Sequence, residues 1–202
     1  MAGDLLIHNS AMVIGGGIVH GDLRVVAGKI ASVASGGGLE PLDGETVIDG
    51  EGLHLLPGAI DPQVHFRDPG QTELEDLESG SAAAASGGVT SFLDMPNNKP
   101  SITTMSGMKT KLDRASEKCI TNYGFFIGAT EDNLDELQSA VGSPNEAHAV
   151  PGICGIKVFM GSSTGDLLVN SEDSLANIFA NTAGLIAVHA EDEDRLNERW
   201  PI

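Results

Sequence analysis

The chain has 202 residues, 41% of them hydrophobic and 20% charged, which is ordinary for a globular protein and excludes a disordered polymer. Acidic residues outnumber basic ones 29 to 11, so the formal net charge is −18. Such a negative surface repels nucleic-acid phosphates and anionic lipid. We therefore expect neither a nucleic acid nor a membrane among the partners of this protein.

Sequence features that direct a protein out of the cytoplasm are missing. The longest apolar runs, Leu53–Ile60 and Gly184–Ala190, are far shorter than the roughly 20 residues that a membrane helix needs. The N-terminal residues lack the basic start and apolar core of a signal peptide. Two cysteines, Cys119 and Cys154, make no disulfide framework, so we expect a cytoplasmic protein with reduced thiols.

Residues 1–54 predict the N-terminal part of a small β-sandwich. Short apolar or alternating runs are separated by glycine-rich punctuation, as expected for strands and turns. The expected strands are Asp4–Ile7, Met12–Ile14, Gly21–Val26, Lys29–Val33 and Glu45–Asp49. Since five short strands are few for a closed sandwich, we expect a later part of the chain to help cover them.

From Leu53 onwards, strand-like and helix-compatible segments alternate. The expected strands are Leu53–Phe66, Val89–Met95, Asn122–Ala129, Gly155–Met160 and Leu185–Ala190. The expected helices are Thr72–Ser86, Thr104–Lys118, Asn133–Val141 and Ser171–Asn181, with another starting near Asp192. Such alternation predicts parallel strands joined by right-handed crossovers, in an α/β fold.

About five βα units can be counted, whereas a (β/α)₈ TIM-type barrel has eight units in roughly 250 residues. A doubly wound open sheet closes with five units. The β-rich start and the residues described next favour the barrel, with residues 55–202 as its first, truncated part. The sequence ends inside the expected fifth helix, so we expect a piece of a longer protein.

The first expected barrel strand ends in a polar stripe. By the period of two, Asp61, Gln63, His65 and Arg67 share one face of an extended segment. Four polar residues in register suit a metal or anion site in the mouth of a barrel, where catalytic groups lie. The alternative is an interior histidine with satisfied hydrogen bonds beside a surface arginine.

The following strand ends carry three further candidates. Asn97 presents a neutral amide to a ligand, unless it is only a turn residue between two prolines. Lys157 lies among Ile, Val and Phe, where a charge is costly. A neutral amine there is a nucleophile, a Schiff-base former or, after adding carbon dioxide, an anionic ligand that bridges two metals. The alternative is a lysine that extends its amine to solvent at a strand edge. His189 follows four apolar residues and is a candidate metal ligand.

Other residues receive plainer interpretations. The run from Gly161 to Gly165 resembles a flexible lid or anion loop, but lacks the ending of a phosphate loop. Glu191 and Asp192 suit the start of the last helix, where acidic side chains are favoured. The remaining histidines are expected at the surface or in packing: His8, His20, His54 and His148.

In order along the chain, these residues resemble the cyclic amidohydrolases, and among them the dihydroorotase family. The resemblance covers the whole chain. Its motifs are Leu-Pro-Gly-Ala-Ile-Asp at 56–61, His-Phe-Arg-Asp-Pro-Gly at 65–70, Gly-Gly-Val-Thr at 87–90, Met-Pro-Asn at 95–97, Gly-Ile-Lys-Val-Phe-Met-Gly at 155–161 and Val-His-Ala-Glu at 188–191. The second and fourth favour dihydroorotase over dihydropyrimidinase or allantoinase.

The resemblance implies a zinc-dependent enzyme of de novo pyrimidine biosynthesis that interconverts dihydroorotate and N-carbamoylaspartate. It implies His65, Lys157 and His189 as ligands of one or two zinc ions, with Lys157 carboxylated. It also implies that Arg67 and Asn97 hold the carboxylate of this small-molecule substrate. Such an enzyme is expected to be a homo-oligomer, of which a dimer is the simplest form.

Two departures leave other functions open. Gln63 stands where the family has a histidine, and an amide is a weaker zinc ligand than imidazole, so Gln63 is at best a weak metal ligand. The family's later metal-binding histidine and its proton-shuttling aspartate would lie beyond residue 202, so no catalytic residue of that kind is expected here. The alternatives are a non-catalytic scaffold subunit and a sister hydrolase acting on dihydropyrimidine, hydantoin or allantoin rings.

Overall fold

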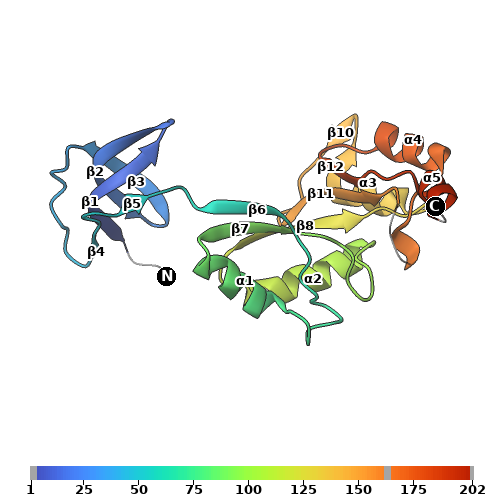
Figure 1. Cartoon of the computed structure of the whole chain (residues 1–202), viewed down its shortest axis with the longest axis horizontal. Helices are drawn as coiled ribbons and strands as arrows, with labels where there is room; N and C mark the ends of the chain where they lie inside the picture. The colour runs from blue at the N-terminus through green and yellow to red at the C-terminus, as the bar shows by residue number, and fades with distance from the viewer. Residues whose placement is uncertain (1–3, 162–164, 201–202) are drawn as a thin grey trace. The chain divides into compact units, whose positions relative to one another are not determined.

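The computed structural model describes residues 4–161 and 165–200 and divides into two compact units, Met1–Pro57 and Gly58–Ile202 (Figure 1). The first unit is a β-sheet. Its strands are β1 (Leu5–Ile14), β2 (Gly17–Val26), β3 (Lys29–Ser35), β4 (Thr46–Asp49) and β5 (His54–Leu55). Strands β1 to β3 pair antiparallel, whereas β4 and β5 both pair parallel with β1.

One strand stands where the sequence predicted two, so the expected break after Ile7 is wrong. β1 continues to Ile14, and its pairing with β2 shifts register between Ile7 and Ser10. Asn9 has a φ of 56° at this point. A β-bulge of this kind disturbs the alternation of side chains without ending the strand.

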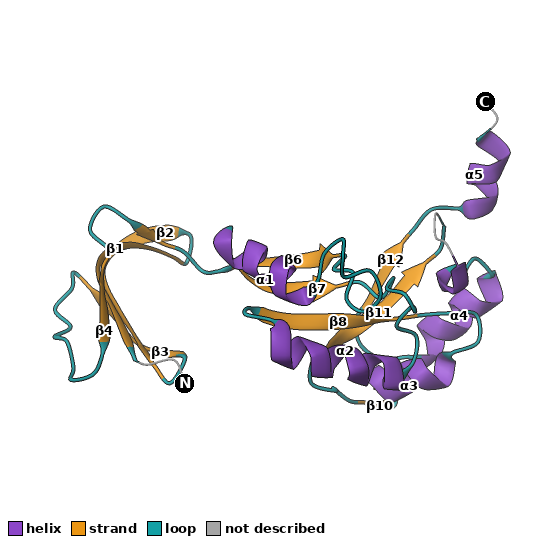
Figure 2. Cartoon of the chain, turned by 90° about the horizontal axis from the view of Figure 1, so that it is seen from below, coloured by secondary structure: helices purple, strands orange, loops and turns teal. Residues whose placement is uncertain are grey.

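The second unit contains a parallel five-stranded sheet with connecting helices (Figure 2). The strands are β6 (Ala59–Val64), β7 (Val89–Asp94), β8 (Asn122–Gly128), β11 (Ile153–Phe159) and β12 (Ile186–His189), in the spatial order β12-β11-β8-β7-β6. The helices are α1 (Leu77–Ser86), α2 (Met105–Lys118), α3 (Leu134–Val141), α4 (Glu172–Asn181) and α5 (Glu193–Arg199). Minor elements are the hairpin β9 (Gly142–Ser143) and β10 (Glu146–Ala147) and the 3₁₀ helix η1 (Gly165–Leu167). Sequential strands as sheet neighbours confirm the expected (β/α)-barrel arrangement.

Four helices begin at a side-chain cap. The expected starts of α2, α4 and α5 coincide with their caps, whereas α1 begins at Leu77, five residues after the expected Thr72. Each capping side chain accepts a backbone N–H of the first helical turn, which has no partner inside the helix. The caps are Asp76 of α1, Thr104 of α2, Ser171 of α4 and Asp192 of α5. The expected role of Asp192 at the start of the last helix is confirmed.

The first barrel strand is shorter than predicted. Residues 54–55 belong to the first unit, and β6 ends at Val64. The pairing of β6 with β7 is interrupted between Asp61 and Val64, where Pro62 has no N–H for the ladder. His65 and Arg67 therefore lie in the loop after the strand. The prediction that Asp61, Gln63, His65 and Arg67 form one regular row is wrong.

The core of the second unit lies between the sheet and its helices. Its largest strand residues are Phe92, Phe125 and Ile156, which meet helix residues such as Leu77 and Met108. Because side chains alternate along a strand, Lys157 and Phe159 of β11 face away from this core. In the part of the chain that the structure describes, no helix combines the length and the apolar character of a membrane span.

Candidate functional site

The loops after β6 and β7 meet through a side-chain hydrogen bond. His65 Nδ1 lies 2.7 Å from Asn97 Oδ1, and both residues are half-buried. Since an amide oxygen only accepts, Nδ1 carries the proton and donates it. This leaves the lone pair of His65 on Nε2. A hydrogen bond that fixes the tautomer in this way is typical of metal-binding histidines.

Arg67 and Asn97 line a cavity of about 460 Å³. Its remaining lining residues are Gln71, Asn98, Lys99, Pro100, Ser101, Asp166 and Leu167. The Ser101 hydroxyl donates to Asp166 Oδ1 at 3.0 Å and thereby ties the start of η1 to the loop after β7. The cavity is lined by two cationic residues, Arg67 and Lys99, and by one acid, Asp166, so it suits an anionic ligand.

Lys157 and His189 lie on one face of the sheet, around the ring of Phe159. In the register of β11 with β12, Lys157 is opposite Ala187 and Phe159 is opposite His189. The Lys157 ammonium lies 5.0 Å from the Phe159 ring centroid, and this ring stacks on His189 at 6.0 Å. Strand pairing therefore brings these two predicted ligands together.

The environment of Lys157 is unusual for a charged group. The side chain is only 3% exposed, and no described residue offers its ammonium a hydrogen bond or an ion pair. Burial lowers the pKa of Lys157, an effect that the charge of Glu191 opposes. The site therefore favours an uncharged amine more than water does.

His189 has a carboxylate partner, since its Nε2 lies 2.7 Å from Glu191 Oε1. The carbonyl oxygen of His189 accepts the N–H of Met160, which fixes the end of β12 against β11. The other oxygen of Glu191, Oε2, is buried without a hydrogen bond from any described residue. This oxygen therefore retains its capacity to accept a hydrogen bond or to contact a cation.

The predicted metal ligands are of types that suit zinc, but they do not form a complete metal site by themselves. Imidazole nitrogens are donors that zinc accepts, and the buried Lys157 amine would offer an oxygen donor once it is carboxylated. His65 follows β6 at one edge of the sheet, whereas Lys157 and His189 lie on β11 and β12 towards the other edge. Gln63 is exposed, and its backbone N–H donates to Asp61 Oδ1 at 3.1 Å. Within residues 4–161 and 165–200, no three His, Cys, Asp or Glu side chains converge on one metal position.

A buried polar cluster behind these loops was not predicted. Lys111 of α2 and Asp94 at the end of β7 are both fully buried, with Lys111 Nζ 2.8 Å from Asp94 Oδ2. Burial raises the pKa of Asp94 and lowers that of Lys111, and each effect is opposed by the partner's charge. The signal was the spacing of α2. Lys111 lies three residues after Met108 and four before Ala115, both buried.

Another buried acid, Asp68, anchors the loop after β6 to α2. Its two oxygens accept from Arg114 Nε at 2.5 Å and Lys118 Nζ at 2.7 Å. Burial raises the pKa of Asp68, but these two hydrogen bonds outweigh it and hold the pKa below the ordinary 3.8. The cysteines are poor nucleophiles, since burial raises the pKa of Cys119 to about 11 and of Cys154 to about 12.

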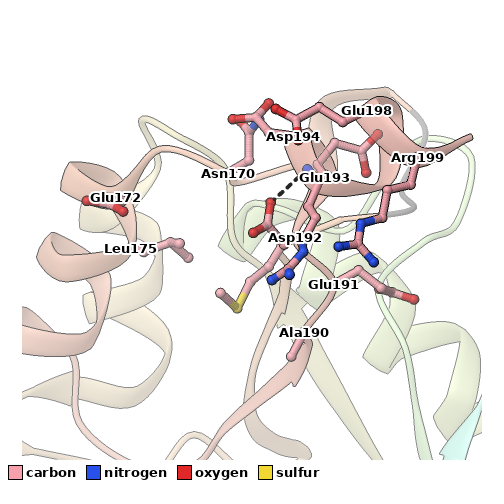
Figure 3. A pocket seen from close by; sticks show the side chains of 12 residues that line it. Asn170, Glu172, Leu175, Ala190, Glu191, Asp192, Glu193, Asp194, Glu198 and Arg199 are labelled. Atoms are coloured by element: carbon pink, nitrogen blue, oxygen red, sulfur yellow. Dashed lines mark hydrogen bonds between the residues drawn. The ribbon is translucent and has the colours of Figure 1, made fainter.

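A larger cavity of about 670 Å³ lies beyond β12, between α4 and α5 (Figure 3). Half of its twelve lining residues are acidic, and only two are basic, Arg195 and Arg199; the acids are Glu172, Glu191, Asp192, Glu193, Asp194 and Glu198. Such a surface disfavours an anionic ligand, so the smaller cavity at Arg67 is the better substrate candidate. The predicted lid loop cannot be placed beside either cavity, because Ser162–Thr164 lie outside the described residues.

Known proteins resemble this chain over nearly its whole length. Residues 54–184 match the model of the amidohydrolase family. An allantoinase of Deinococcus radiodurans is 34% identical over 199 residues, and a dihydroorotase of Methanosarcina acetivorans is 33% identical over 193. These matches cover 96% and 94% of the chain but only 42% and 39% of the relatives.

The solved structures agree. An L-hydantoinase (dihydropyrimidinase) from Arthrobacter aurescens superposes with a TM-score of 0.80 at 26% identity, covering 98% of this chain and 43% of that one. A dihydropyrimidinase from Brevibacillus agri gives 0.73 at 31% identity, covering 96% and 41%. The chain thus spans about two-fifths of the length of these proteins. The family match over residues 54–184, together with the parallel sheet and its connecting helices, shows that this chain belongs to the amidohydrolase family.

Proposed function

We propose that this chain is part of a zinc-dependent dihydroorotase, which interconverts dihydroorotate and N-carbamoylaspartate. The observation that carries the proposal is the cavity that Arg67 and Asn97 line beside His65. Dihydroorotate carries a ring carboxylate, and a planar guanidinium binds a carboxylate through two parallel hydrogen bonds. Rings of the hydantoin and allantoin type lack this carboxylate and need no such arginine.

In this proposal, Asn97 has two tasks. Its Oδ1 accepts the proton of His65 Nδ1, so its Nδ2 remains to donate to the substrate carboxylate. Arg67 binds the same carboxylate and orients the ring. His65, carboxylated Lys157 and His189 would hold zinc, which when bound activates water and polarises an amide carbonyl. Gln63 contributes weakly to metal binding or not at all.

A sister activity is the second candidate, because relatives named allantoinase are as similar as those named dihydroorotase. We also propose the setting expected from the sequence, a cytoplasmic homo-oligomer with a small-molecule substrate and neither nucleic acid nor membrane as partner. A non-catalytic scaffold is the remaining alternative, and Gln63 is the residue that supports it.

Steady-state kinetics of the full-length protein test the proposal. The panel contains dihydroorotate, N-carbamoylaspartate, hydantoin and allantoin, with wild type, Arg67→Met and Arg67→Lys. We expect turnover of dihydroorotate, with kcat/KM reduced about 100-fold or more in Arg67→Met, since a charge-assisted pair is lost. Arg67→Lys keeps the positive charge but not the planar guanidinium that forms two parallel hydrogen bonds, so it should recover only part of the lost kcat/KM.

The other outcomes are equally clear. Preference for hydantoin or allantoin, with Arg67→Met unaffected, assigns the sister activity. Near-zero zinc in a well-folded, inactive protein assigns the scaffold. One or two zinc ions per chain, with turnover abolished by chelation and by Lys157→Ala, supports the enzyme.

A further inference from the structure

A buried cluster joins the two loops that carry His65 and Asn97. We call it the Lys111 clamp, comprising Lys111, Asp94 and Asn98. The Lys111 ammonium lies 2.8 Å from Asp94 Oδ2, 2.8 Å from Asn98 Oδ1 and 3.2 Å from the Met95 carbonyl oxygen. The contacts with Asn98 Oδ1 and the Met95 carbonyl are hydrogen bonds, whereas the contact with Asp94 Oδ2 is an ion pair without hydrogen-bond geometry. Two of the three acceptors belong to the loop that follows β7.

The same cluster holds the loop after β6. Asp94 Oδ1 accepts the N–H of Phe66 at 3.0 Å, and Asn98 Nδ2 donates to the carbonyl oxygen of Phe66 at 3.2 Å. Phe66 directly follows His65, and Asn98 directly follows Asn97. Each partner in the hydrogen bond between His65 and Asn97 is therefore the chain neighbour of a clamped residue.

The position of the clamp excludes direct contact with a ligand of the cavity through Lys111. Lys111 and Asp94 are completely buried, and the ammonium also lies 4.7 Å from the Phe125 ring centroid, inside the core between α2 and the sheet. Lys111 can therefore act on the site only through the loops that it holds.

We propose that Lys111 is a positioning residue of the candidate metal site, which holds the Asn97 amide on His65 Nδ1 so that His65 offers Nε2 to metal. This inference rests on the proposed function, in which His65 is a metal ligand. The competing explanation is that Lys111 only neutralises the buried charge of Asp94. Neutralisation alone does not require Asn98 or the Met95 carbonyl.

Two variants separate these roles. Asp94→Asn with Lys111→Met removes both charges together, so no unpaired charge is buried, and pairs replaced in this way often keep the fold. Asn98→Ala instead leaves the Lys111–Asp94 pair intact and breaks the clamp at the loop. Lys109→Met is the matched control, because Lys109 lies on the same helix in an exposed pair with Asp113.

Two measurements on the full-length protein provide the test. Nitrogen NMR of ¹⁵N-histidine-labelled, metal-free protein reports which ring nitrogen of His65 is protonated, with Asn97→Ala to assign the signal. Zinc affinity is measured by competition with a chromophoric chelator. We expect Nδ1–H in wild type and in Lys109→Met, a mixture of tautomers in both clamp variants, and zinc binding weakened about 10-fold or more in them.

The outcomes are distinct. The proposal is overturned if either clamp variant folds and keeps the wild-type tautomer and affinity, or if wild-type His65 carries its proton on Nε2. If the double variant does not fold, Asn98→Ala decides alone. If wild type binds no zinc but its tautomer depends on the clamp, the metal function fails while the positioning role of Lys111 stands.

Discussion

Gly80 leaves the space that the ring of Phe66 occupies. A Cβ built on Gly80 would lie 2.5 Å from Phe66 Cε1, closer than any real carbon contact. Phe66 packs edge-on against Phe92 with ring centroids 4.8 Å apart. A glycine inside a helix costs about 1 kcal/mol relative to alanine, so its place in α1 has to be offset by this contact. Since Phe66 directly follows His65, the absence of a Cβ at Gly80 contributes to the position of His65, a candidate metal ligand.

We therefore expect Gly80→Ala to destabilise the protein by about 1–3 kcal/mol, because overpacking outweighs the gain in helix propensity. Gly87→Ala is the control. It lies at the C-cap of the same helix, with a φ of −91°, and its added Cβ would meet nothing closer than 3.6 Å. Urea unfolding of both variants measures the difference. Equal stability of the two would contradict the steric role of Gly80.

At the scale of elements, α2 holds the loop after β6 from outside the site. Asp68 is fully buried, but its partners Arg114 and Lys118 are 39% and 29% exposed. When the acid is removed, these two cations can return to water, whereas loss of a partner inside a fully buried pair leaves a stranded charge. The Lys111 clamp and the ion pairs of Asp68 thus connect the same helix to the same loop. Removing one partner costs more stability in the fully buried clamp than at Asp68.

For Asp68→Asn we expect a loss of about 1–3 kcal/mol at neutral pH. The pKa of Asp68 is lower in the folded protein than its ordinary 3.8. Its contribution is therefore complete above pH 3.8 and disappears as the pH falls through the folded pKa. Urea unfolding at several pH values should show a constant gap between wild type and variant from pH 7 to 5, shrinking below about pH 4. A gap that widens in acid would exclude this assignment.

Local signals explain which elements were predictable. The starts of α2, α4 and α5 follow capping side chains, and the apolar runs of β7, β8, β11 and β12 stand between helical segments. The bulge in β1 and the interrupted pairing around Pro62 depend on a neighbouring strand, which the sequence of one segment does not contain. At both places the expected strand boundaries were wrong, as they were at the start of β2, which begins at Gly17 and not at the expected Gly21.

In the candidate site, too, the sequence predicted local features but not the contacts between distant residues. Lys157 was expected to be buried because apolar residues surround it in sequence, and it is 3% exposed. The pairing of His65 with Asn97 joins residues 32 apart in sequence, and the clamp joins Asp94 to Lys111, which lies 17 residues later in α2. Contacts of this kind depend on the order of the strands and the packing of the helices, which local sequence patterns do not specify. Only the helical spacing of Lys111 pointed to its burial beforehand.

At the scale of the whole molecule, the acidic excess is the dominant electrostatic feature. The formal charge is −18, while the described ion pairs that involve lysine or arginine use few of the 29 acids. The pairs at Asp94, Asp68 and Glu45 have acids that are 0–1% exposed, so salt screens them little. The unpaired surface acids repel one another and are fully open to screening.

Added salt should therefore stabilise this protein, in contrast to one held together by surface ion pairs. Raising NaCl from 10 to 150 mM shortens the screening length from about 30 to about 8 Å, which removes most of the repulsion between surface carboxylates. We expect the free energy of unfolding in urea to rise on the order of 1 kcal/mol, with KCl giving the same increase at equal ionic strength. A fall in stability with salt would mean that exposed pairs such as Lys109–Asp113 outweigh the net charge. Because the buried pairs are protected, Asp68→Asn should show the same salt dependence as wild type.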